Sequence, residues 1–137
     1  MKETKISQRF GLSVESIEQD KLSSRLRQIS HQGPALQSHA ELLAKTQRLL
    51  DTVTYLEDEL QIIEQDQVRQ AVILRSKTPH QHAQSLSYYE ICLQQDGLTL
   101  IQQPVYHSQR TETQLGDFVL SDRLLERLGQ DFQKIIK

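Results

Sequence analysis

The sequence contains few of the residues that form disulfides, stack as aromatic rings or act as thiol nucleophiles in small proteins. It contains one cysteine, no tryptophan, four tyrosines and three phenylalanines. The single cysteine, Cys92, excludes a disulfide within the chain, and so few aromatic rings argue against a stacking platform for single-stranded nucleic acid. The five glycines form no glycine-rich loop after a predicted strand, so the signature of a phosphate-binding loop is missing.

Two further absences concern membranes and charge. The sequence has no apolar run of about 18 residues and no apolar core of the kind found in signal peptides. Its net charge is −2, which provides no overall field to attract phosphates or anionic lipids. We therefore expect a cytoplasmic protein, and 137 residues suit a single domain that can fold alone.

The segment from residue 34 to residue 68 carries the strongest periodic pattern in the chain. Its apolar positions follow a heptad, with a seven-residue leucine-type repeat and two intervening members: Leu42, Leu49, Leu56 and Ile63, with Val53 and Leu60. After Pro34 neither proline nor glycine interrupts the pattern, which predicts one long helix with a coiled-coil seam. Such a helix would be about 50 Å long, whereas a compact domain of this length is about 37 Å across. We therefore expect the seam to be covered in a homodimer or by a partner helix; the alternative is the chain's own sheet and final helix.

A shorter helix is predicted in front of this segment. It would begin at Ser13 or Ser16 and place apolar residues on one broad face: Val14, Ile17, Leu22, Leu26 and Ile29. Gly33 and Pro34 suit the end of one helix and the start of the next. Residues 13–67 are therefore predicted to form a helical hairpin, preceded by a flexible terminus over residues 1–12.

The second half of the chain predicts strands and a final helix. Residues 70–75, 86–94 and 98–106 have strand-like apolar patterns, and Asp96–Gly97 favours a hairpin in which Leu93 faces Leu100. Pro104 indicates an edge strand. Ser121 is expected to cap an amphipathic helix. The predicted fold class is α+β, with a three- or four-stranded antiparallel meander over residues 68–137 in one domain of residues 13–137.

No residue set in the sequence makes a convincing chemical site. His80, His82 and His107 could bind zinc only if the fold brought them together, and their spacing is not that of a zinc finger. Cys92 lies within a predicted strand, without the helix start or sharp turn that would activate a nucleophile. We therefore predict a protein that is not an enzyme and has no cofactor or metal site.

These patterns favour an adaptor or assembly factor, an accessory protein that contacts another protein through the long helix and a sheet edge. The predicted interaction surface combines the exposed seam with two flanking acids: Val53, Leu56, Leu60, Ile63, Glu57 and Glu64. The alternative is a regulatory nucleic-acid-binding protein that uses the helical hairpin. Its candidate basic residues are Lys21, Arg25, Arg27, Arg69, Arg75 and Lys77.

Overall fold

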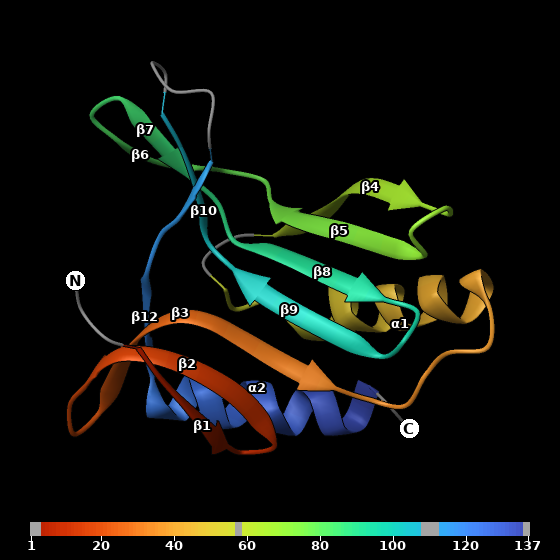
Figure 1. Cartoon of the computed structure of the whole chain (residues 1–137), viewed down its shortest axis with the longest axis horizontal. Coiled ribbons are helices and arrows are strands. Elements are labelled where there is room, and N and C mark those ends of the chain that lie inside the picture. Colours follow the sequence, from red (N-terminus) through yellow and green to blue (C-terminus); the bar gives the residue numbers. More distant parts are fainter. Residues whose placement is uncertain (1–3, 57–58, 108–112, 136–137) are drawn as a thin grey trace.

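The computed structural model describes residues 4–56, 59–107 and 113–135. Within these residues the chain forms a large antiparallel sheet with two helices on one face, and a small second sheet beside it (Figure 1). The large sheet has the spatial order β1 (Lys5–Arg9), β2 (Leu12–Gln19), β3 (Ser23–Gln32), β9 (Leu98–Gln102), β8 (Glu90–Gln94), β5 (Ala71–Ser76) and β4 (Leu60–Asp66). A further strand, β12 (Phe118–Ser121), also pairs with β3.

The strands of the small sheet come from two segments of the sequence, one between β5 and β8 and the other between β9 and β12. Its spatial order is β11 (Gln114–Leu115), β10 (Pro104–His107), β7 (Ser85–Ser87) and β6 (His80–His82). The helices are α1 (His39–Thr52), which connects β3 to β4, and α2 (Asp122–Ile135), which follows β12. Neither of these helices, nor any other among the described residues, is long and apolar enough to cross a membrane.

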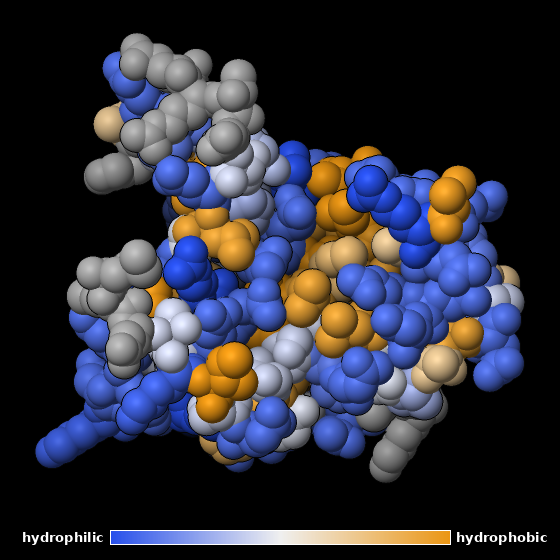
Figure 2. Space-filling model, viewed as in Figure 1, coloured by the Kyte–Doolittle hydropathy of each residue, from blue (hydrophilic) through white to orange (hydrophobic). Residues whose placement is uncertain are grey.

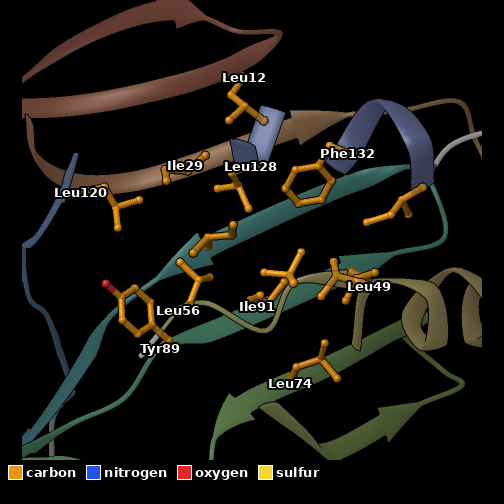
Figure 3. Packing of buried hydrophobic residues seen from close by; sticks show 14 of the residues in the cluster. Leu12, Ile29, Leu49, Leu56, Leu74, Tyr89, Ile91, Leu120, Leu128 and Phe132 are labelled. Carbon is orange, nitrogen blue, oxygen red and sulfur yellow. The ribbon is translucent and has the colours of Figure 1, made fainter. Parts of the chain in front are cut away.

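The hydrophobic core lies between the large sheet and the two helices (Figure 3). Alternate residues of β5, β8 and β9 face it, as period-two burial requires, and include Leu74, Ile91 and Ile101. Leu49 of α1 and Phe132 of α2 close the core from the other side, and both are almost completely buried. The chain therefore covers its own leucine-rich surface.

The predicted helical hairpin and coiled coil are wrong, and so is the three- or four-stranded meander, because the described strands form an eight-stranded and a four-stranded sheet. The chain forms β2 and β3 where the first helix was expected, and these strands pair with each other. Register shifts between Glu15 and Ser16 and between Ser16 and Glu18 interrupt the strand alternation, so the apolar residues of this segment fall at spacings that resemble a helix. The terminus expected to be flexible contributes β1, which pairs with β2.

The single long helix is also wrong, because α1 ends at Thr52. Three β-branched residues and a tyrosine follow one another there, Thr52, Val53, Thr54 and Tyr55, and all four have low helix propensity. The next part of the heptad pattern forms β4 instead. Leu42 and Leu49 repeat at helical spacing on α1, whereas Leu56 fills the core from the loop after it.

The predicted hairpin across Asp96–Gly97 is confirmed, but its register differs by one residue. The loop contains three residues, Gln95 to Gly97, so Leu93 pairs with Thr99 instead of Leu100. Gly97 has a φ of +97°, which suits the bulge position of a three-residue hairpin loop. Because a shift of one residue reverses the faces of a strand, Leu98 and Leu100 point away from the core.

Two other predictions were confirmed and one was wrong. A strand does occupy residues 71–76, and α2 begins after Ser121, whose hydroxyl accepts a hydrogen bond from the Leu124 amide at 3.2 Å. Pro104, however, does not mark an edge, because β10 lies between β7 and β11. Proline is tolerated there because it is the first residue of the strand.

Candidate interaction surface

The face of the large sheet opposite the helices has an apolar centre. Figure 2 shows apolar side chains gathered over the region where β5, β8 and β9 lie in Figure 1. Direct cross-strand pairing places Ile73 beside Cys92 and Cys92 beside Leu100, and all three are half-buried. Leu100 lies on this face because the three-residue loop of the hairpin shifts the pairing by one residue from the predicted register.

A pocket of about 280 Å³ opens on this face next to β4. Two cross-strand rows build it, one formed by Glu64, Ile73 and Cys92, the other by Asp66, Ala71 and Gln94. Arg69, in the turn between β4 and β5, completes the lining. The floor is apolar and the side toward β4 is charged.

The charge at this pocket is negative because one of its two carboxylates is not neutralised. Asp66 accepts hydrogen bonds from the Val68 and Arg69 amides, each at 3.0 Å, and its other oxygen lies 3.6 Å from Arg69 Nε. Glu64 is exposed and has no hydrogen-bond or ion-pair partner within the described part of the chain. Glu64 therefore supplies a carboxylate that is available to a ligand.

Cys92 lies in the same negative field. Burial raises the pKa of the Cys92 thiol, and the charges of Glu90, Glu64 and Asp96 raise it further, although a hydrogen bond with Gln94 opposes them. A thiol with a raised pKa is mostly protonated near neutral pH and is a poor nucleophile. This site therefore offers an apolar wall in a negative potential, and not an activated sulfur.

Strand β4 forms one end of the large sheet, because among the described strands it pairs with β5 only. Its register shifts between Ile62 and Glu64, and this bulge leaves Ile62 and Ile63 38% and 40% exposed. Such a strand presents backbone N–H and C=O groups along its outer side. The open edge and the pocket thus form one continuous surface.

The structure brings only some of the predicted interaction residues to this surface. Ile63 and Glu64 lie on the exposed part of β4, whereas Leu60 pairs with the buried Ser76 and packs against the core. Val53 and Leu56 are each only 1% exposed and belong to the core, so they are inaccessible to a partner. Glu57 lies outside the described residues.

The apolar floor of the pocket was missed by sequence reasoning. Its residues, Ala71, Ile73 and Cys92, fall in predicted strands, for which the sequence predicts no apolar pocket. The signal was present: Val72, Ile73 and Leu74 form an unbroken apolar run, as do Ile91, Cys92 and Leu93. A strand with consecutive apolar residues has two apolar faces, only one of which can face the core.

The histidines considered for zinc lie on the small sheet. His80 pairs with Ser87 and His107 pairs with Ser85, on opposite sides of β7. His82 also pairs with Ser85, but its side chain is outside the described part of the structure. Among the residues described, no group of three histidine, cysteine, aspartate or glutamate side chains is arranged to hold a metal ion.

The candidate basic residues for nucleic-acid binding do not form one patch. Arg25 lies on β3 and makes an ion pair with Asp117 at 2.9 Å, while Arg75 lies on β5 and pairs with Glu90 at 3.0 Å. Lys77 pairs with Glu59 at 2.8 Å near β4. These cations are therefore divided between different strands and are already paired with acids.

Comparison of the chain with protein-family models, with curated proteins and with solved structures finds no match. The surface on β4, β5 and β8 is therefore interpreted from its own geometry and charge.

Proposed function

We propose that this protein is an interaction module that binds an extended, positively charged segment of another protein along β4 and the neighbouring pocket. The observation that supports this most is the continuity of an open strand edge with an apolar, negatively charged pocket. Backbone hydrogen bonds to a sheet edge provide affinity, and a pocket beside that edge selects side chains of the added strand.

The chemistry of the pocket favours a lysine or arginine side chain. The aliphatic stem of such a residue would pack on Ile73 and Cys92, while its charged end would reach the carboxylate of Glu64. The bulge after Ile62 limits continuous pairing to a few residues on either side. We therefore expect a small interface and a transient complex, and not a permanent one.

The test compares the natural sequence with two single variants on β4, Ile63→Lys and Glu64→Lys. Immobilised protein is incubated with lysate of the source cells, and retained proteins are quantified by mass spectrometry. Both variants should lose the same specific partner, because each adds a positive charge at the site of a positively charged segment.

Ile6→Lys is the matched control for this experiment. Ile6 is 73% exposed on β1, at the opposite end of the large sheet, so the same substitution there should leave binding unchanged. If the β4 variants retain everything that the natural protein retains, the proposal is wrong. Retention of nucleic acid that is lost steeply with salt and abolished by Arg25→Gln would instead support the alternative function.

Self-association remains a separate prediction. With the coiled-coil seam absent, a second copy would have to use the sheet edges or the uncovered face. Sedimentation velocity at micromolar concentration would test this directly, and a single species of 15.9 kDa would contradict the homodimer.

A further inference from the structure

Three polar side chains are buried together beneath α1, where the end of β3 meets the start of β9. Lys45 of α1 and Thr99 of β9 are each 1% exposed, and His31 of β3 is 4% exposed. Lysine and histidine side chains are rarely buried to this extent without a charged or hydrogen-bonding partner. This cluster has no part in the proposed interaction surface, which lies on the other face of the sheet.

The backbone brings these three side chains together. His31 and Thr99 are direct cross-strand partners, so their side chains lie side by side on the face toward the helices. Lys45 Nζ donates a hydrogen bond to the Gly97 carbonyl oxygen at 3.5 Å, and the same oxygen accepts one from the Gly33 amide at 2.9 Å. The His31 ring also stacks on Phe132, with ring centroids 5.0 Å apart, which holds the imidazole in place.

The hydrogen-bonding capacity of the cluster is largely unused. Thr99 Oγ1 and His31 Nδ1 have no partner among the described residues. Lys45 has three ammonium protons and one long hydrogen bond, and no carboxylate in the described chain forms an ion pair with it. Buried polar groups are normally satisfied, so unsatisfied ones indicate a bound water or ion.

The electrostatics of the cluster favour an anion over water alone. Burial lowers the pKa of Lys45 and the charge of Arg48 lowers it further, while Asp96 opposes this. Burial also lowers the pKa of His31, with a second contribution from the charge of Lys45. The charges of Lys45 and Arg48 make the local potential positive, although Asp96 opposes them, and a bound negative charge would stabilise the ammonium form of Lys45.

We propose that Lys45, Thr99 and His31 form a buried site for a small inorganic anion of the chloride class. The ammonium, the threonine hydroxyl and an imidazole N–H on Nδ1 can all donate to it. The near-complete burial of Lys45 and Thr99 selects a compact ion over a phosphate or a carboxylate ligand. The ion would tie α1 to β3 and β9 without any acidic side chain.

The experiment is thermal unfolding of the full chain near neutral pH in sodium chloride and in sodium methanesulfonate at equal ionic strength. Chloride should raise the midpoint, because an ion that binds only the folded state shifts the equilibrium. With a Kd of about 10 mM, chloride at about 100 mM would increase the folding equilibrium constant roughly tenfold.

Two variants and one control identify the site. Lys45→Met should abolish the difference between the two salts, and Thr99→Val should reduce it. Lys5→Met removes an exposed lysine of β1 and should preserve it. Equal midpoints of the natural protein in both salts, or a difference that survives Lys45→Met, would overturn the proposal.

A second readout keeps the test valid if Lys45→Met does not fold. Exchange of chloride with the site should broaden the chloride NMR resonance of the natural protein, and Thr99→Val should lessen that broadening. A chloride line width that is the same with and without the natural protein would also count against the site.

Discussion

At the residue scale, Tyr55 connects the loop after α1 to α2. Its hydroxyl donates a hydrogen bond of 2.6 Å to Asp131 Oδ2, and the Arg127 guanidinium lies 4.0 Å from the centroid of its ring. Burial, followed by the hydrogen bond and charge of Asp131, raises the pKa of Tyr55 well above its usual range, so it remains a donor at ordinary pH. Asp131 is only 8% exposed and depends on such donors.

Tyr55→Phe should therefore destabilise the protein by about 1–3 kcal/mol, because Asp131 loses its closest donor. Urea unfolding measures the change. Tyr88→Phe is the matched control, because its ring contacts with Arg75 and Tyr106 are kept and its hydroxyl makes no hydrogen bond within the described residues. An equal effect of the two substitutions would show that the Tyr55 hydroxyl has no special role.

His31 predicts how stability depends on pH. Burial, and then the charge of Lys45, lowers its pKa below 6.5, so the unfolded chain binds a proton more readily than the folded protein does. Folding stability contributed by neutral His31 is therefore complete above about pH 6.5 and declines as the pH falls toward its folded-state pKa.

His31→Phe should flatten this part of the pH profile while retaining a ring against Phe132. Urea midpoints measured between about pH 5 and pH 7 would show the smaller slope. An unchanged slope in the variant would mean that another group causes the acid sensitivity.

At the element scale, the β8–β9 hairpin depends on Gly97. A Cβ atom at this position would lie 2.3 Å from the Gly33 carbonyl oxygen, and the φ of +97° is unfavourable for any side chain. Backbone atoms cannot move aside cheaply, so both the clash and the strained conformation oppose substitution. The close approach of Gly33 also joins the hairpin loop to the start of the segment that leads into α1.

Gly97→Ala should lower the free energy of unfolding by more than about 2 kcal/mol, since the conformational strain alone is about 1–2 kcal/mol. Chemical denaturation is the measurement. Asp96→Ala, in the same loop, removes an exposed hydrogen bond to the Leu98 amide and a favourable charge near Lys45, without a clash or a strained conformation, and should cost less. The reverse order would show that the loop can relax around a side chain.

At the scale of the whole molecule, Arg75 joins the two sheets. Its Nη2 donates to Glu90 Oε2 at 3.0 Å and to the Tyr106 hydroxyl at 2.8 Å, so that β5 and β8 of the large sheet are linked to β10 of the small one. The guanidinium also lies over the rings of Tyr88 and Tyr106, at 5.0 and 5.3 Å from their centroids.

Arg75→Met should therefore increase amide hydrogen exchange in β6, β7 and β10 and leave the large sheet protected. Mass spectrometry of peptide fragments would resolve the two regions. Arg27→Met, at an exposed position of β3, is the control and should change neither. Uniformly faster exchange in both sheets would mean that Arg75 stabilises the molecule as one unit.

The accessible surface fits this arrangement of sheets. It amounts to 8454 Å² for 15.9 kDa, whereas a compact monomer of that mass exposes about 7,400 Å². A sheet covered by helices on one face only, with a second small sheet beside it, contributes to this larger exposed area. The uncovered face is also where the proposed partner binds.

Local signals were sufficient for some elements. The Asp96–Gly97 loop, the strand at residues 71–76 and the Ser121 cap were predicted correctly, because turn dihedrals, β-branched side chains and capping hydroxyls act within a few residues. The predicted hairpin register was wrong, because a loop of three residues instead of two changes the pairing by one position. That single position decided whether Leu100 faced the core or the outer face.

The amino-acid sequence by itself determined where the hairpin and the final helix form, and that this chain has an excess of leucine to bury. Only the tertiary structure decided what covers that leucine: β3 pairs with β9 across some seventy residues, Ile29 beside Ile101, and creates the sheet on which Leu42 and Leu49 pack. The heptad spacing is compatible with an exposed seam and with a buried face. Pairing between distant strands, which no local pattern encodes, selects between them.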